Sequence, residues 1–136
     1  MNILVVDGHG GMLGAQLVKE ISTRFKDVTV NAVGTNTVAT AAMLKAGAES
    51  GATGENPVVV GARKADVIIG PIGIVIADSL SGEITPNMAV SVGSADAVRI
   101  LIPMNKCDNM VAGINGVPTS DLIEDVILKL KKIIVA

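Results

Sequence analysis

The sequence predicts a three-layer α/β domain built on a doubly wound, mostly parallel sheet of about five to six strands. Apolar, β-branched segments alternate with segments of helical periodicity, and several of the apolar segments end in glycine-rich turns. The chain shows no internal repeat and no interdomain linker. Its 136 residues, 49% of them hydrophobic, suffice for one core, so we expect residues 1–136 to form a single domain.

The first unit is a strand, a glycine turn and a helix. Residues 2–6 (NILVV) form a continuous apolar run, which is typical of a strand covered on both faces of a parallel sheet. After the turn at residues 7–11, an amphipathic helix is predicted by apolar residues at every fourth position: Leu13, Leu17, Ile21 and Phe25. A second strand over residues 28–33 then completes a right-handed βαβ unit.

The second unit adds a helix over residues 37–46. Thr35 or Asn36 is placed to cap its first turn, and Gly47 is placed to end it. The most secure later strand covers residues 67–70 and ends in another turn of glycine and proline.

The segment between these elements is ambiguous. Residues 58–60 (VVV) favour a strand by composition, but six residues separate them from Val67, too few for a parallel crossover of about a dozen. Asn56, followed by proline, is a good helix cap, so we expect a helix over residues 57–65. The third strand is then confined to residues 48–53.

The C-terminal part continues the alternation. Thr85 and Pro86 begin a helix that extends to about residue 94, and residues 99–102 form a fifth strand. Residues 110–113 are expected to add a short edge strand. A final amphipathic helix has acidic residues in its first turns and lysines in its last, an order that favours the helix dipole.

Charge and aromatic content argue against a nucleic-acid partner. The 11 Lys and Arg residues stand against 13 Asp and Glu residues, so the net charge of −2 offers no excess of cations to a phosphate backbone. Phe25 is the one aromatic residue, and bases therefore lack side chains on which to stack.

Cysteine and histidine counts exclude two further classes. A single cysteine cannot form an intrachain disulfide, and with one histidine it supplies too few soft ligands for a zinc site, so we expect no metal. The chain start lacks a signal peptide's basic region, and the apolar run at residues 67–77 is shorter than the roughly 20 residues of a membrane span. We expect a cytoplasmic protein without membrane contact.

The strongest functional motif is the turn after the first strand. Parallel sheets bind ligands outside the carboxyl ends of their strands, and here the turn has the pattern G-x-G-G-x-x-G, formed by Gly8, Gly10, Gly11 and Gly14. Backbone amides in such a turn can approach a phosphate at the helix N-terminus. His9 can contact the phosphate or relay protons, or it is only an exposed loop residue. The same glycines can instead serve only a tight turn and close packing, with Asp7 orienting the turn by accepting its N–H groups.

The other turns at the carboxyl edge carry weaker signals. Residues 34–37 (GTNT) lack the carboxylate that usually binds an adenosine ribose. Asn36, Thr35 and Thr37 can hold a ribose or a phosphate by neutral hydrogen bonds or only cap the next helix, and NAD and NADP remain equal cofactor candidates. Gly70, Pro71 and Gly73 would meet a nicotinamide ribose or form only a rigid turn. Residues 51–56 (GATGEN) can bind an anion or simply lead into a helix. Lys106 beside Cys107 could favour its thiolate, but we expect this lone cysteine to be inert.

Five sequence blocks carry a resemblance to a known family. They are residues 7–11 (DGHGG), 32–36 (AVGTN), 51–56 (GATGEN), 65–75 (ADVIIGPIGIV) and 101–103 (LIP). Together they resemble a family of short uncharacterised bacterial proteins, catalogued as a domain of unknown function and common in anaerobic, clostridium-like bacteria. The resemblance implies a Rossmann-like fold over nearly the whole chain and assigns no substrate, reaction or catalytic residue.

Two functional hypotheses follow. The first is binding of a nucleotide, dinucleotide or phosphorylated small molecule at residues 8–14, in a cleft completed by Asn36 and residues 70–73. If the protein is an enzyme, hydride transfer with a nicotinamide cofactor is the natural class. The second is a non-catalytic sensor or assembly module whose glycine turns are structural, with apolar helix faces supporting a homodimer or larger homo-oligomer.

Overall fold

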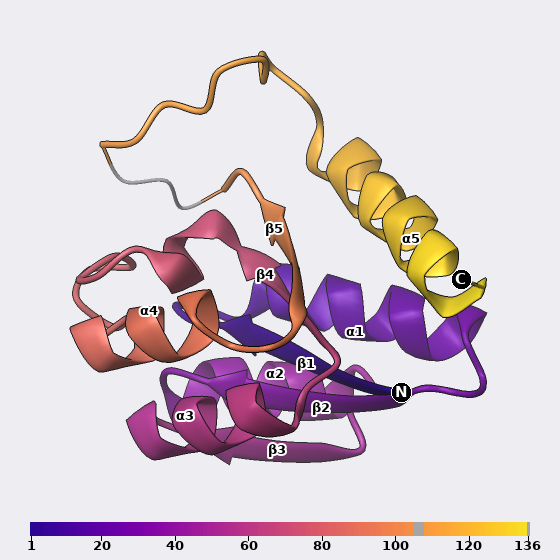
Figure 1. The fold of residues 1–136 in the computed structure, drawn as a ribbon, viewed down its shortest axis with the longest axis horizontal. Coiled ribbons are helices and arrows are strands. Elements are labelled where there is room, and N and C mark those ends of the chain that lie inside the picture. Colours follow the sequence, from indigo (N-terminus) through magenta and orange to yellow (C-terminus); the bar gives the residue numbers. More distant parts are fainter. Residues whose placement is uncertain (105–107, 136) are drawn as a thin grey trace.

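A computed structural model describes residues 1–104 and 108–135 (Figure 1). The elements in chain order are β1 (Asn2–Asp7), α1 (Met12–Arg24), β2 (Thr29–Gly34), α2 (Thr37–Lys45), β3 (Ser50–Thr53), α3 (Glu55–Lys64), β4 (Val67–Pro71), the 3-10 helix η1 (Ile72–Val75), α4 (Pro86–Gly93), β5 (Val98–Ile102) and α5 (Thr119–Val135). This alternation confirms the predicted α/β class.

The sheet is parallel throughout, and its strand order is β3-β2-β1-β4-β5. β1 lies at the centre, with Val5 opposite Ala32 of β2 on one side and Ile69 of β4 on the other. The chain builds outward from β1 to β3 and then crosses to β4, so the strand order reverses between β1 and β4. In doubly wound sheets this switch point is where a crevice forms outside the carboxyl ends of the strands.

Helices cover both faces of the sheet, which makes the three predicted layers. On one face, the inward side chains of β1, including Ile3 and Val5, pack with those of α1, α2 and α5. On the other, Leu4 and Val6 pack with α3, α4 and η1. β1 is thus buried on both faces, as its continuous apolar sequence predicts.

The structure confirms most predicted elements and corrects two. Residues 58–60 are helical, and the third strand lies within the predicted range. α3, however, begins at Glu55 with Gly54 as its cap, so Asn56 lies inside the first turn and does not cap the helix. Residues 110–113 form no strand. A hydrogen bond from the Ile114 amide to the Val111 carbonyl closes a turn there, so the sheet has five described strands.

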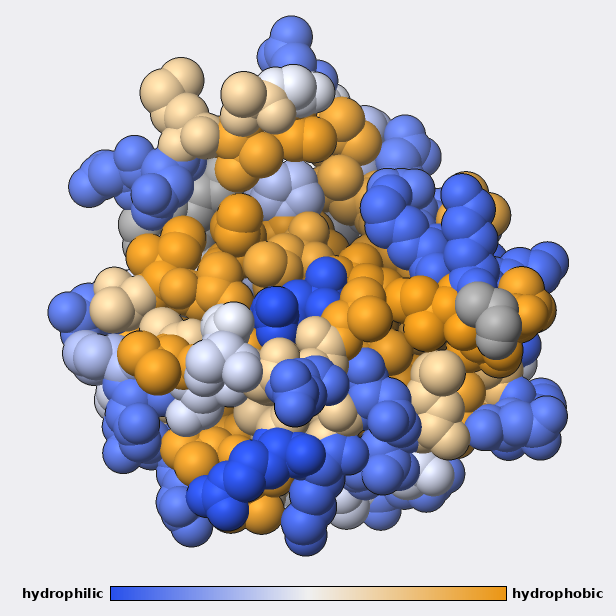
Figure 2. All heavy atoms as spheres, viewed as in Figure 1, coloured by the Kyte–Doolittle hydropathy of each residue, from blue (hydrophilic) through white to orange (hydrophobic). Residues whose placement is uncertain are grey.

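Apolar side chains gather in the middle of the face seen in Figure 2, around the edge strand β5 and between α4 and α5. Val98 of β5, Leu128 of α5 and Val90 of α4 are each at least half exposed. Within residues 1–104 and 108–135, we find no helix with the length and apolar composition needed to cross a bilayer.

Gly70 and Gly93 give a matched test of the sheet packing. A Cβ at Gly70 would lie 2.4 Å from the Val6 carbonyl oxygen of β1, whereas a Cβ at Gly93 meets open space at the end of α4. We expect Gly70→Ala to lower the free energy of unfolding by about 1–3 kcal/mol, because the two central strands must move apart. Gly93→Ala should raise it by up to about 1 kcal/mol, since alanine favours a helix. Urea denaturation followed by circular dichroism measures both, and equal effects would contradict the close approach of β1 and β4.

Candidate functional site

The carboxylate of Asp7 organises the turn after β1. Its Oδ1 accepts the Gly8 N–H at 2.8 Å and its Oδ2 accepts the Gly14 N–H at 2.7 Å, so one side chain joins the end of the strand to the first turn of α1. Asp7 is only 2% exposed. The orienting role predicted for Asp7 is confirmed by these two bonds. Burial raises the pKa of Asp7 above its ordinary value, and the two backbone hydrogen bonds only partly oppose this effect.

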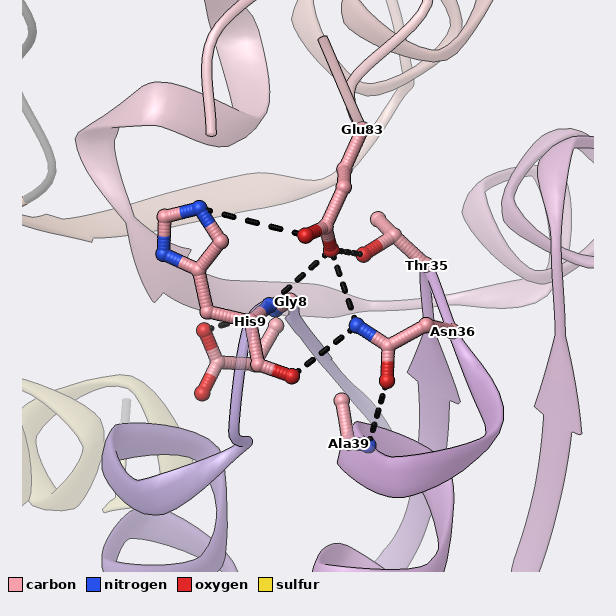
Figure 3. Close-up of polar contacts among 7 residues, drawn as sticks. Gly8, His9, Thr35, Asn36, Ala39 and Glu83 are labelled. Carbon is pink, nitrogen blue, oxygen red and sulfur yellow. Dashed lines mark hydrogen bonds and ion pairs between the residues drawn. The ribbon is translucent and has the colours of Figure 1, made fainter. Parts of the chain in front are cut away.

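A second carboxylate, that of Glu83, lies on the outer side of the same turn (Figure 3). Its Oε1 accepts three hydrogen bonds: from the His9 amide at 2.9 Å, from Thr35 Oγ1 at 2.5 Å and from Asn36 Nδ2 at 2.9 Å. These donors follow β1 and β2, while Glu83 comes from the segment between η1 and α4. Three donors from two turns therefore converge on one anionic oxygen.

The electrostatics of Glu83 fit this arrangement. Partial burial raises the pKa of Glu83, but the hydrogen bonds from Thr35, the His9 amide and Asn36 together outweigh it, so the pKa lies below its ordinary value. The Oε2 atom lies 3.9 Å from His9 Nε2, and both side chains are partly open to solvent. Glu83 is thus held as a carboxylate within reach of an imidazole.

Residues 76–84, which we call the 76–84 loop, place Glu83 over the turn. Asp78, Leu80 and Ser81 have left-handed backbone conformations, which non-glycine residues rarely adopt. The loop closes on itself through a hydrogen bond from the Asp78 amide to the Ile84 carbonyl at 2.7 Å. Leu80 and Ile84 are buried in the core, so the loop is fixed on both sides of Glu83.

The structure brings together part of the predicted site. His9 and Gly10 are exposed in the turn, and Asn36 Nδ2 donates to the His9 carbonyl at 2.9 Å, which joins the first two strand ends. Asn36 also accepts the Ala39 N–H through Oδ1, so it is the cap of α2 as well as a donor to Glu83. The predicted capping role of Asn36 is confirmed.

The other turn glycines are buried in close packing. A Cβ at Gly8 would meet Thr35, Leu80 and Glu83, and a Cβ at Gly14 would meet Met43 and Asp7, all within 3.0 Å. Gly11 has a left-handed backbone (φ 73°), and its Cα lies against the backbone of α2 at Ala39. Packing alone therefore explains three of the four glycines of the motif.

The remaining predicted residues are either buried or lie away from the turn after β1. Gly70, Pro71 and Gly73 are buried, and the Gly73 carbonyl accepts the Ser79 hydroxyl of the 76–84 loop. That loop therefore contacts both the turn after β1 and the turn after β4.

The glycine-rich segment at residues 51–56 lies at the edge strand β3, where the Thr53 hydroxyl is 2.7 Å from that of Thr40. Cys107 and its neighbour Lys106 lie outside the described residues. In the described ranges, no three His, Cys, Asp or Glu side chains are grouped as a metal site would require.

Glu83 is the residue that sequence reasoning missed as a member of the site, whereas Thr35 is one of the ligand candidates that the sequence offers beside Asn36. Glu83 is 74 residues from His9 in the chain, and no periodic pattern surrounds it. One signal was present: Gly82 precedes Glu83 in a segment with buried apolar residues on either side, which indicates a folded turn. That signal predicts a structured loop but does not say which turn the loop contacts.

Comparison with known proteins places the chain in a family without a stated activity. Residues 2–135 match the family described as "Domain of unknown function (DUF3842)", which agrees with the resemblance noted in the sequence.

Among curated proteins, the chain is similar to "Chaperonin GroEL 1" of Mycobacterium ulcerans (strain Agy99), with 28% identity over 120 residues, covering 88% of this chain and 20% of that protein. It is also similar to "Chaperonin GroEL 1" of Mycobacterium leprae (strain TN), with 35% identity over 104 residues, covering 76% of this chain and 18% of that protein. The chain thus spans about a fifth of the length of these curated relatives.

Among solved structures, the chain is similar to a dodecameric FMN-dependent Ubix-like decarboxylase from Escherichia coli O157:H7. The TM-score is 0.47 at 15% sequence identity, and the match covers 97% of this chain and 75% of the other.

Replacement of Asp7 by asparagine tests its role in the turn. Asp7→Asn keeps the shape of the side chain but places an amide group against one of the two backbone amides, so one buried N–H loses its acceptor. We expect the free energy of unfolding at neutral pH to fall by about 1–3 kcal/mol. Chemical denaturation measures the change, and an unchanged stability would contradict the two-amide contact.

The hydrogen bonds to Glu83 predict a pH-dependent contribution to stability. Because the folded-state pKa lies below the ordinary value of 4.5, the contribution is present above pH 4.5 and is lost as the pH falls through the lowered pKa. Glu83→Gln should therefore destabilise the protein more at about pH 7 than at about pH 3. The pKa of Asp7 is shifted in the opposite direction, but Asp7 is present in both the wild type and the Glu83→Gln variant. The difference in stability between the two proteins therefore reports the contribution of Glu83. A pH-independent difference would contradict the prediction.

Proposed function

The chain belongs to the DUF3842 family, and from that premise we propose that it binds the anionic group of a nucleotide or another phosphorylated small molecule at the donors that now hold Glu83. We call these donors, the His9 amide, Thr35 Oγ1 and Asn36 Nδ2, the anion-binding site. In this proposal Glu83 is an internal anion that the ligand displaces.

The observation that carries the proposal is the convergence of the three donors on a single carboxylate oxygen. Hydrogen bonds to an ionised acceptor are stronger than those between neutral groups, and they favour the charged form. A site that lowers the pKa of a carboxylate is by its chemistry an anion receptor. Phosphate offers several oxygens to the same donors.

The position of the site supports a phosphate in particular. The donors lie at the carboxyl ends of β1 and β2, beside the N-termini of α1 and α2, where the helix dipoles favour negative charge. Gly10 is exposed in this turn, and a Cβ there would have its nearest neighbour at 3.9 Å, so a ligand can approach the backbone. Of the motif's glycines, Gly10 is therefore the one whose absent side chain matters for access.

Displacement of Glu83 requires little rearrangement. The backbone of the 76–84 loop is anchored by Leu80 and Ile84, but the Glu83 side chain is 27% exposed and can turn outward. The rotation frees all three donors at once. NAD and NADP are included among the candidate ligands. Thr35 and Asn36, which contact Glu83, come directly after β2, and dinucleotide-binding proteins of this topology contact a ribose at that position.

A second candidate function, a non-catalytic sensor or assembly module, is favoured by two observations. Close packing explains Gly8, Gly11 and Gly14 without any ligand. The apolar surface around β5 supplies an area that a second copy of the chain can cover, since an edge strand offers unpaired backbone groups. In this alternative Glu83 is a permanent structural contact.

Substitution of Glu83 distinguishes the two functions. Glu83→Gln removes the competing negative charge, so inorganic phosphate, AMP, NAD or NADP should raise the melting temperature of the variant more than that of the wild type. We expect an affinity gain of about fivefold or more, equivalent to about 1 kcal/mol. Sodium chloride at equal ionic strength controls for general salt effects, and Glu49→Gln, an exposed carboxylate elsewhere, controls for net charge.

Three outcomes are informative. A gain limited to Glu83→Gln supports displacement of an internal anion. A loss of binding in Glu83→Gln would overturn it and assign Glu83 to a ligand hydroxyl. No response from either protein to any of the four probes would favour the structural role of the glycines.

A further inference from the structure

A second recess, separate from the anion-binding site, lies between α3 and the β1–β3 part of the sheet. It has a volume of about 480 Å³, within the range of about 300–1,000 Å³ that small-molecule sites occupy. We call it the α3 groove. α3 lies across this part of the sheet in Figure 1, and the groove extends along its ten residues, or about 15 Å.

The groove is present because the facing surfaces of α3 and the sheet carry small residues, which do not fill the space between them. α3 buries Val58 and Ala62 in the core, and it turns a neighbouring stripe toward the groove: Pro57, Val60, Gly61 and Lys64. On the opposite wall, all four residues of β3 are exposed. A Cβ at Gly51 would point at Leu44 of α2, so Ala52, its neighbour in the strand, faces the groove.

The groove is apolar along its length and cationic at one end. Leu4 and Val33 form its floor and are themselves buried. Lys64 and Asn31 line it near the amino ends of the strands. Ser50 donates to Asn31 Oδ1 at 2.7 Å, and within the described part of the chain neither Asn31 Nδ2 nor Lys64 Nζ has a partner. None of its lining residues is acidic.

We propose that the α3 groove binds a small anionic amphiphile, with its apolar body against Leu4, Val33 and Ala52 and its carboxylate at Lys64 and Asn31. The groove complements such a ligand because it is apolar along its length and has the donors of Lys64 and Asn31 at one end. This site is independent of the anion-binding site, which lies at the carboxyl edge of the sheet.

The test uses octanoate, whose alkyl chain and carboxylate match the groove, and octanol as its uncharged counterpart. Titration into isotopically labelled protein should shift the amide resonances of Asn31, Gly51 and Gly61 and leave those of His9 and Glu83 unchanged. The chain has no Trp or Tyr, so displacement of the fluorophore anilinonaphthalene sulfonate gives a second readout without intrinsic background.

Two variants and one control test the position of the ligand. Ala52→Leu fills the groove from an exposed edge strand and should weaken octanoate binding at least about tenfold. Lys64→Gln should weaken octanoate about two- to fivefold and leave octanol unchanged, as expected for a solvent-exposed charge pair. Arg63→Gln, which removes a cation pointing to the α4 side of the same helix, should have no effect.

Several results would overturn the proposal. Equal octanoate affinity for Ala52→Leu and wild type, with both folded by circular dichroism, would place the ligand elsewhere. Resonance shifts confined to the β1 turn would do the same. If Ala52→Leu instead changed the particle mass in light scattering and octanoate did not bind, the groove would be a contact between copies of the chain.

Discussion

The carboxyl edge of the sheet depends on one buried contact, the Asp7 carboxylate with the amides of Gly8 and Gly14. It ends the central strand, fixes the direction in which α1 begins and sets the conformation of the turn between them. Because β1 is flanked by β2 and β4, the same contact positions the turn relative to both neighbouring strand ends. Asp7 accepts the Gly8 amide, and the next amide along the chain, that of His9, donates to Glu83.

Because of Glu83, the polar groups at the carboxyl edge of the sheet differ from those at the amino edge. At the carboxyl edge, the donors of the turns are already satisfied by a side chain of the same chain. At the amino edge, Lys64 Nζ and Asn31 Nδ2 have no partner among residues 1–104 and 108–135, and they lie beside an apolar wall. Under the two proposals the regions therefore place opposite requirements on a ligand: at the carboxyl edge it must replace a carboxylate, and at the amino edge it has only to supply one. A single small molecule does not satisfy both, since the regions lie at opposite ends of the strands.

Local pattern and topology were sufficient to predict much of the fold. The structure confirms the strand predicted from the continuous apolar residues of β1 and the Asn36 and Thr85 caps. It also confirms the helix at residues 58–60, which was predicted because too few residues remained for a parallel crossover. The prediction of a short strand at residues 110–113 was wrong, because β propensity does not show whether a segment has a neighbouring strand to pair with. Glu83 could not be found because its contact with His9 spans 74 residues, and its loop is specified by left-handed conformations at Asp78 and Leu80, which have no glycine to mark them.

The anchoring of the 76–84 loop also bears on rates. Leu80 and Ile84 hold its backbone in the core, so the proposed displacement of Glu83 needs rotation of one side chain and not the opening of a lid. Rotamer changes of exposed side chains take picoseconds to nanoseconds, and the three hydrogen bonds to Glu83 slow its rotation, whereas lid opening takes microseconds or longer. If an anion binds here as we propose, its access to the turn therefore does not wait for a microsecond motion of the backbone.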